Sequence, residues 1–387
     1  MNRRVWQISG GRGPERRFPM LDALRGMAVL AVVLLHAAQE CGANANASYG
    51  MVTTQLRVGV TLFFLLSGFL LYRPYALALA RFDARPSLGG YAVRRMLRIV
   101  PAYWVALTVL AVWPGLPGVF TRDAWIYYGF AQSYRNSWAL AGIAPAWSLS
   151  VEVAFYTLLP LLGELLRRVA TSRGPDERRS LQLRALALLG VASLALRGVG
   201  HGLGNAHLQT MIFTHFLWFA LGMSVAVWSV ETEVSGLQSR AARFVERNSG
   251  VCWLVAAAAY AVLCAAPIFP RAWAPGQTAW SVTTEHVLYA CVALALLLPA
   301  VFGDRGNGWP RRVLASPTLR WFGLISYSLF LWHYPLLSAL AARGASQWLP
   351  GWPLLSLCLV SLPPILAISW LSYAWIERPM LRWGRPE

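Results

Sequence analysis

Ten long apolar segments, separated by shorter arginine-rich connections, constrain this chain more than any other feature of its sequence. A helix needs about 20 mostly apolar residues to cross the hydrocarbon core of a bilayer. In lipid, only helices and closed barrels pair all of their backbone polar groups. We therefore predict an all-α polytopic membrane protein with about ten transmembrane helices. The predicted spans lie near residues 21–39, 58–80, 97–114, 146–166, 182–199, 210–229, 250–267, 284–302, 320–341 and 353–376.

Composition agrees with a membrane protein and argues against a soluble protein that binds nucleic acid. Of the 387 residues, 57% are hydrophobic and 13% are charged. The formal net charge of +18 comes from arginines that cluster between the apolar segments and do not form one basic face. This is the charge pattern of cytoplasmic loops. We expect the lipid bilayer as a partner and no nucleic acid.

The distribution of arginine predicts how the chain is oriented. All 34 basic residues are arginine, and 28 of them fall on the cytoplasmic side if the N-terminus is cytoplasmic. We therefore expect both termini in the cytoplasm, tails at 1–17 and 384–387, and a multi-pass membrane domain at 18–383 in the cytoplasmic (inner) membrane. The six arginines on the other side are Arg57, Arg122, Arg135, Arg197, Arg271 and Arg343.

Several polar features lie at the predicted ends of the spans. The external connection at 115–145 is rich in aromatic residues and is expected to form a structured cap or re-entrant piece. Glu285 and His286 begin the eighth span and are expected at the membrane interface, as are Glu377 and Arg378 at the end of the tenth. The five cysteines and six histidines show no paired or metal-ligand spacing, so we expect no disulfide framework and no metal site.

The first span contains two ionisable residues, Arg25 and His36, at the ends of the stretch "RGMAVLAVVLLH". At about 100° per residue, eleven positions amount to three turns plus about 20°, so both side chains share one face about 16 Å apart. We expect Arg25 at an anion-binding entrance and His36 at depth as a general base. The alternatives are a topology anchor for Arg25 and a hydrogen-bonded structural histidine for His36.

The third span opens with a cluster of arginines in "RRMLRIVPAYW". Arg95 and Arg98 are three residues apart and Arg94 and Arg98 are four apart, so each pair shares a helix face. Guanidinium groups grip phosphate oxygens bidentately. The cluster therefore predicts a phosphate-binding pocket, with ordinary positive-inside charge as the alternative.

The stretch "PAWSLSVEVAFYTLLPLL" places Glu152 inside an apolar helix. A carboxylate there must be neutralised or paired. We expect Glu152 either to orient and stabilise His36 or to pair with an arginine. The residues expected to line a substrate cavity are Trp147, Ser150, Tyr156 and His333. For the first three, core packing is the alternative; for His333, in "SYSLFLWHYPLL", a purely structural role is equally open.

Six stretches of the sequence together resemble acyltransferase family 3, a family of integral membrane O-acyltransferases. They are "LDALRGMAVLAVVLLH", "GVTLFFLLSGFLLYRP", "RRMLRIVPAYW", "AWSLSVEVAFYTLLP", "SYSLFLWHYPLL" and "IERPMLRW", and the resemblance covers roughly residues 18–383. The family's Arg/Lys-x10-His motif corresponds to Arg25 and His36. Its Arg-x-x-Arg motif corresponds to Arg95 and Arg98, and its acidic residue to Glu152.

This resemblance implies an acyl-CoA donor, with acetyl-CoA the default, that enters from the cytoplasm and acylates a hydroxyl. Family acceptors are sugars, polysaccharides and macrolides. We expect His36 to act as general base with Glu152 in support, or to form an acyl-histidine. Thr61 stands where many relatives carry an aspartate, and we expect no appended SGNH-type domain. A proton-coupled transporter of an anionic small molecule is the alternative function, because such carriers also place His and Glu in the membrane.

Overall fold

The structure is a computed structural model that describes residues 18–46, 49–82, 86–134, 139–205, 208–265, 277–303 and 308–383. The predicted tails at 1–17 and 384–387 lie outside the described residues. Within the described ranges the chain forms helices and turns and no strand. The predicted all-α class is therefore confirmed.

Helices occur at all ten positions where the sequence predicts a span. In the described part of the chain, eight spans are long and apolar enough to cross a membrane, or up to ten if each of two bent pairs is one span. This confirms the predicted polytopic architecture. The helices that carry the eight spans are α1 (Met20–Glu40), α3 (Val58–Arg81), α4 (Leu88–Leu110), α6 (Trp147–Val169), α7 (Pro175–Gly202), α8 (Ile212–Ser235), α11 (Ala279–Val301) and α15 (Pro353–Ser372).

Two further candidate spans are bent pairs of helices. α9 (Arg240–Arg247) meets α10 (Ser249–Ala265) at 84°, and α13 (Pro317–Leu324) meets α14 (Ser326–Ala341) at 73°. The second bend divides a stretch whose apolar pattern predicts one continuous helix. Because of this bend, α13 packs along the first half of α1. α14 contacts the second half of α1.

Glycines hold α13 tightly against the first half of α1. A Cβ on Gly26 would lie 2.2 Å from the carbonyl oxygen of Leu319, and a Cβ on Gly323 would lie 1.8 Å from that of Asp22. Both distances are far shorter than a van der Waals contact. Small residues of this kind let helix backbones approach closely in a membrane, so α1 and α13 form a rigid unit.

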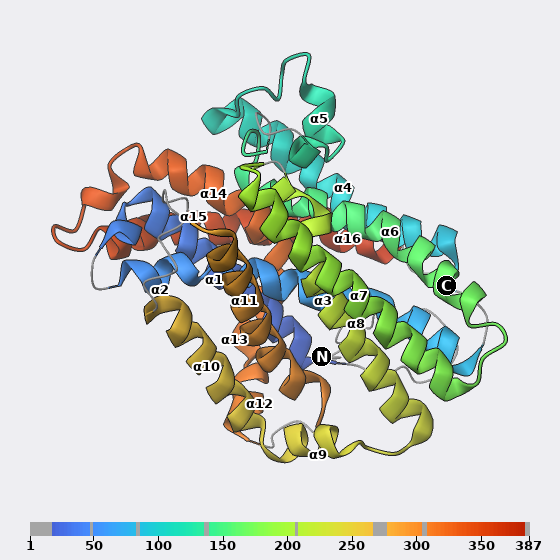
Figure 1. The fold of residues 1–387 in the computed structure, drawn as a ribbon. Helices are drawn as coiled ribbons and strands as arrows, with labels where there is room; N and C mark the ends of the chain where they lie inside the picture. The colour runs from blue at the N-terminus through green and yellow to red at the C-terminus, as the bar shows by residue number, and fades with distance from the viewer. Residues whose placement is uncertain are drawn as a thin grey trace, which may run out of the picture.

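α1 and α3 lie side by side in the interior and run antiparallel (Figure 1). The Phe18 ring, just before α1, packs edge-on against Phe69 with centroids 5.0 Å apart. Farther along α1, Val32 packs against Gly59, where a Cβ would lie 3.0 Å from the Val32 Cγ2 atom. The start of α3, preceded by the short α2 (Gly50–Gln55), therefore lies beside the second half of α1.

The described part of the 115–145 connection is folded, as predicted for a structured cap. It includes α5 (Ala124–Tyr128), which projects from one end of the molecule in Figure 1. The Tyr103 hydroxyl of α4 donates to the Tyr127 carbonyl over 2.9 Å, and the Trp104 indole N–H donates to the Tyr128 carbonyl over 2.9 Å. These bonds tie the cap to α4.

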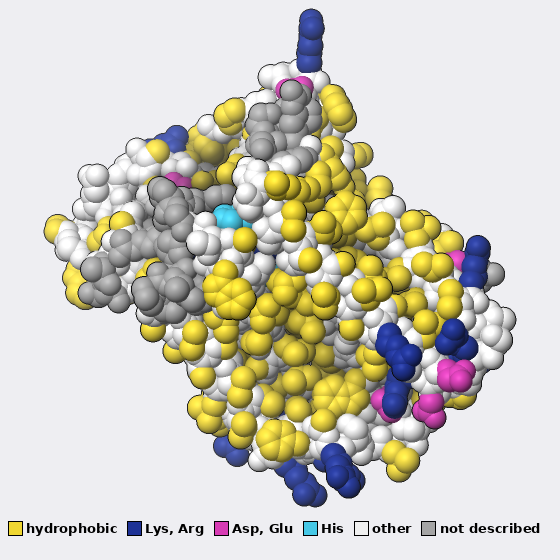
Figure 2. All heavy atoms as spheres, in the orientation of Figure 1, with side chains coloured by type: hydrophobic (Ala, Val, Ile, Leu, Met, Phe, Trp, Pro, Cys, Tyr) yellow, Lys and Arg dark blue, Asp and Glu magenta, His cyan; other side chains and the backbone are white. Residues whose placement is uncertain are grey.

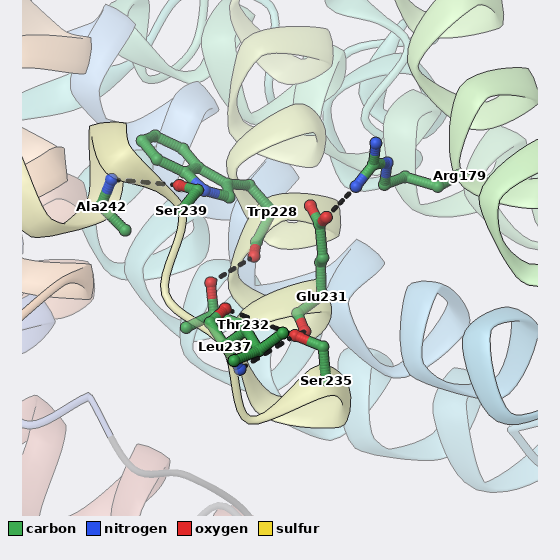
Figure 3. Close-up of polar contacts among 8 residues, drawn as sticks. All are labelled: Arg179, Trp228, Glu231, Thr232, Ser235, Leu237, Ser239 and Ala242. Carbon is green, nitrogen blue, oxygen red and sulfur yellow. Dashed lines mark hydrogen bonds and ion pairs between the residues drawn. The ribbon is translucent and has the colours of Figure 1, made fainter.

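Charged groups gather at the edges of an apolar surface. Figure 2 shows apolar side chains over the middle of one face, with most of the visible arginines at its lower and right edges. Near the start of α9, Arg179 pairs with Glu231, and the Trp228 indole N–H donates to the Ser239 hydroxyl over 2.9 Å (Figure 3). That hydroxyl also accepts from the Ala242 N–H and caps α9. An apolar belt with charged ends is what a bilayer requires.

Gly323→Ala should lower the melting temperature of the detergent-solubilised protein, because the new methyl group meets the Asp22 carbonyl. Overpacking of this kind typically costs about 1–3 kcal/mol. Fluorescence-detected size-exclusion chromatography after heating measures the effect. Gly89→Ala is the matched control, since a Cβ at Gly89 has nothing within 4 Å. Equal melting temperatures for the two variants would contradict the packing role.

Candidate active site

His36 of α1 is hydrogen-bonded to a second histidine, His333 of α14. The His36 Nδ1 atom lies 2.8 Å from His333 Nε2, and the two rings stack with centroids 5.0 Å apart. Tyr334 packs edge-on against His36, also with centroids 5.0 Å apart. His333 is fully buried, whereas His36 is partly exposed. The sequence left open whether His333 is structural or lines a cavity. The structure places it in contact with His36, the predicted general base.

The contacts of His333 determine which nitrogen of His36 carries a proton. His333 Nδ1 lies 3.0 Å from the Leu329 carbonyl oxygen and 2.8 Å from that of Phe330. A carbonyl only accepts, so His333 Nδ1 must be protonated. In neutral His333 the Nε2 atom is then an acceptor, and His36 must donate to it from Nδ1. Neutral His36 therefore has its lone pair on Nε2, on the side away from His333.

The structure brings Arg25 of α1 together with Arg95 and Arg98 of α4, and these three form the arginine cluster. Both α4 arginines are among the charged groups that act electrostatically on Arg25. Arg25 Nη1 lies 3.4 Å from Asp22 Oδ1, and its side chain is 16% exposed. Arg95 lies over the Tyr156 ring, and its buried Nε has no partner among the described residues. The cluster therefore has donors available for an anion.

Glu152 lies at the Arg25 end of α1 and not beside His36. Its Oε1 atom accepts a hydrogen bond from the Ser67 hydroxyl over 2.6 Å, and it is among the charges acting on Arg25 and Arg95. In the part of the chain that the structure describes, no hydrogen bond joins it to His36. Arg25 and His36 are about 16 Å apart along the helix, so a carboxylate beside Arg25 cannot also orient His36. Of the two predicted roles, the geometry argues against the first; Glu152 acts electrostatically on Arg25 and Arg95, and no ion pair joins it to either among the described residues.

The other predicted site residues do not form one cavity. Arg94 folds back along α4, with its Nη1 atom 3.0 Å from the position of a Cβ on Gly90. Trp147 packs against His215 of α8, with ring centroids 5.4 Å apart. The Ser150 hydroxyl is bonded to the Ala146 carbonyl of its own chain segment. Of the predicted cavity residues on α6, only Tyr156 contacts the arginine cluster. Its ring lies against Arg95, where α6 meets α4.

Three ionisable residues predicted to lie at the membrane interface are instead buried. Glu377 is 4% exposed and accepts a hydrogen bond from Ser328 of α14. Glu285 is also 4% exposed and pairs with Arg57 at 2.5 Å, and the neighbouring His286 is 1% exposed. Burial inside the protein leaves their predicted depth in the membrane untested; the two glutamates are buried because each is satisfied by a donor from another segment of the chain. Hydropathy along a single segment carries no signal of that donor.

Comparison with known proteins identifies the family to which this chain belongs. Residues 18–374 match the acyltransferase domain that defines acyltransferase family 3. The match covers nearly the whole chain, so this protein belongs to that family. The resemblance predicted from the six stretches is confirmed.

Curated relatives are similar over the same region. The chain is 25% identical over 393 residues to "Putative peptidoglycan O-acetyltransferase YrhL" of Bacillus subtilis, covering 96% of this chain and 56% of the relative. It is 23% identical over 401 residues to "Peptidoglycan O-acetyltransferase OatA" of Listeria monocytogenes, covering 96% and 57%. The chain thus spans a little over half the length of these relatives. No solved structure matches the chain at a comparable level of significance.

Loss of the His333 acceptor should change the tautomer of His36. In the wild type, ¹⁵N NMR of histidine-labelled protein should show an unprotonated His36 Nε2 at neutral pH. In His333→Leu, the Nδ1–H tautomer should lose about 1 kcal/mol of hydrogen bonding, a change of roughly fivefold in the tautomer ratio.

His333→Gln is the matched variant, because its amide oxygen still offers an acceptor near the position of Nε2. It should keep most of the Nδ1–H tautomer. An unprotonated Nδ1 of His36 in the wild type would contradict the hydrogen-bond assignment directly.

Proposed function

We propose that this protein is a membrane O-acyltransferase that moves an acyl group, acetyl by default, from acyl-CoA to a hydroxyl of an acceptor. The observation that carries this proposal is the layout of α1: the arginine cluster at one end and the His36–His333 pair about 16 Å along the same helix. The names of the relatives support a carbohydrate or glycan acceptor, with a macrolide as the family's other class of acceptor.

The arginine cluster suits the head of coenzyme A. That head is rich in phosphate oxygens, and guanidinium groups bind such oxygens with paired hydrogen bonds. Arg95 and Arg98 would hold the phosphates, and Arg25 would guide the head or the start of the arm. Glu152 would limit repulsion among the arginines before the donor binds. The thin arm would then follow α1, so that its thioester reaches His36.

His36 would serve as general base in a direct transfer. Its Nε2 atom takes the proton of the acceptor hydroxyl while the hydroxyl oxygen attacks the carbonyl carbon of the thioester. The tetrahedral intermediate collapses, the carbon–sulfur bond breaks, and the thiolate of coenzyme A leaves and takes the proton back from His36. His333 would hold the ring in the tautomer that leaves Nε2 free, as a carboxylate does in a catalytic triad.

His36→Ala should reduce turnover by about 10²- to 10⁴-fold, the range supplied by a general base. Release of free coenzyme A from acetyl-CoA, with a carbohydrate acceptor present, measures the rate in detergent solution. His201→Ala is the matched control, because His201 is a partly exposed histidine bonded to the Gln277 carbonyl, far along the chain from His36. Full turnover in His36→Ala would overturn the proposal.

The same assay separates the enzyme from a carrier, because detergent solution contains no sealed compartment to transport into. A single turnover with acetyl-labelled acetyl-CoA and no acceptor then distinguishes the two chemical routes. Direct transfer predicts no label on the protein. Label trapped on His36 would replace direct transfer with an acyl-histidine intermediate.

Arg95→Glu and Arg98→Glu should each raise the KM for acetyl-CoA by about tenfold or more, since a hydrogen bond to a charged group contributes about 1.5–3 kcal/mol. The kcat at saturating donor should change less. Arg94→Glu is the matched control, because Arg94 folds back over Gly90. A donor KM that rises equally in all three variants would indicate general surface charge and not a defined phosphate pocket.

A further inference from the structure

A second buried group of polar side chains lies away from the arginine cluster. It joins residues from four long helices and is called here the Arg197 cluster. Its members are Arg57 at the start of α3, Arg197 of α7, His215 of α8, and Glu285, His286 and Tyr289 of α11. Four of these are at most 4% exposed, namely His215, Glu285, His286 and Tyr289.

One half of the Arg197 cluster is a closed network. Arg57 donates from Nη2 to Glu285 Oε1 over 2.5 Å and from Nε to the Tyr289 hydroxyl over 2.6 Å. The Tyr289 hydroxyl in turn donates to Gln55 Oε1. Burying an ion pair in this way is tolerated only when hydrogen bonds satisfy both partners, and here they do.

The other half of the cluster is not satisfied. The Nε and Nη1 atoms of Arg197 are buried without a partner among the described residues, as are both ring nitrogens of His286. Glu285 is the one carboxylate among the charges acting on Arg197, and it is already bonded to Arg57. With neutral histidines, two arginines face one glutamate. Arg197 is partly exposed, but two of its donor atoms are buried without a partner, and ionisable residues of this kind within a membrane segment are usually functional.

One member of the Arg197 cluster, Arg57, lies at nearly the same level along the helix pair as the predicted catalytic histidine. Val32 of α1 packs against Gly59 of α3. His36 is one turn beyond Val32, and Arg57 is two residues before Gly59. Because α1 and α3 are antiparallel, His36 and Arg57 both lie on the same side of the Val32–Gly59 contact, toward one end of the helix pair. His36 is then about 6 Å and Arg57 about 3 Å beyond the contact, so their levels differ by about 3 Å along the axis.

Aromatic rings border the unsatisfied half. Trp218 stacks on the His286 ring with centroids 3.8 Å apart, and Trp147 packs against His215. Amphipathic aromatic rings beside a few convergent polar groups are typical of small-molecule sites. Unpaired donors on Arg197, together with an acceptor and a donor on His286, suit a ligand that carries both an anion and hydroxyl groups.

We propose that the Arg197 cluster binds an oxyanion, a carboxylate or a phosphate, carried by the sugar whose hydroxyl reaches His36. Arg197 pairs with the oxyanion, and His286 binds a neighbouring hydroxyl. The link to acyl transfer rests on the proposed function, whereas the binding of an acidic sugar does not. The acceptor is accordingly an acidic carbohydrate, and its charged group is bound by residues other than those of the arginine cluster.

Equilibrium binding tests this without any need for turnover. The protein is placed in phosphatidylcholine nanodiscs at fixed ionic strength, and its affinity is measured for D-glucuronate, glucose 6-phosphate and D-glucose. At least one acidic sugar should bind about tenfold or more tightly than glucose, the effect of one hydrogen bond to a charged group. Arg197→Gln should abolish the preference, and Arg197→Lys should keep part of it.

Arg343→Gln is the matched control, because Arg343 is exposed and bonded to the Ala339 carbonyl on α14. It should keep the full preference. Equal affinity for acidic and neutral sugars in the wild type would overturn the proposal, as would a preference that survives Arg197→Gln. If phosphatidylglycerol in the nanodisc displaces glucuronate in an Arg197-dependent way, the cluster binds a lipid headgroup and the acceptor assignment fails.

Failure of this proposal is distinguishable from failure of the proposed function. A wild-type protein that binds acidic sugars through Arg197 but never releases coenzyme A from acetyl-CoA would retain the binding site and lose the acyltransferase proposal. A protein that transfers acetyl groups but shows no Arg197-dependent preference would do the reverse.

Discussion

An ionisable side chain inside a bilayer must find its partner within the protein, and this constraint organises the structure around α1. Arg25 and His36 stand on one face of that helix, and each is met by a different neighbour: Arg25 by α4 and α6, and His36 by α14. These contacts between helices can form only if the helices do not slide along one another. The backbone contacts at Gly26 and Gly323 provide that register, because α1 cannot move along α13 without a clash.

The arrangement would also keep the charged groups of the two substrates away from the groups that react. If both substrates are anionic, they repel each other wherever their charged groups come close. The arginine cluster and the Arg197 cluster are built from different residues on different helices, so the two charged groups would be bound at separate places. Only the uncharged ends, a thioester and a hydroxyl, would meet at His36. There the low dielectric strengthens the hydrogen bond between the two histidines.

Local properties of the sequence predict much of this architecture. The ten helices follow from apolar length, and the shared face of Arg25 and His36 follows from helical periodicity alone. Contacts between distant segments could not be predicted in the same way. His333 is 297 residues from His36, and the bend that brings it there interrupts an otherwise continuous apolar pattern. Glu152 was assigned two possible partners, and only the packing of α6 against α3 and α4 decides between them.

Residues at helix ends were the least predictable part of the site. Glu285, His286 and Glu377 stand near the ends of apolar segments, where exposure to the interface is the usual outcome. Their burial depends on donors such as Arg57 and Ser328, which are supplied by other helices. Arg57 and Arg197 are predicted to lie on the side with few arginines, and this exception to the positive-inside pattern is the signal in the sequence of a second site.

The rigid contact between α1 and α13 bears on which acyl groups the protein would accept. The distance from Arg25 to His36 is a fixed number of residues on one helix, and the glycine contacts prevent that helix from sliding along α13. Donors with different acyl chains share the same head and arm, so each would present its thioester at the same depth. Selection by chain length would then depend on the space beyond His36, beside Tyr334 and His333. Larger or smaller side chains at those positions, and not changes among the arginines, would alter acyl-chain selectivity.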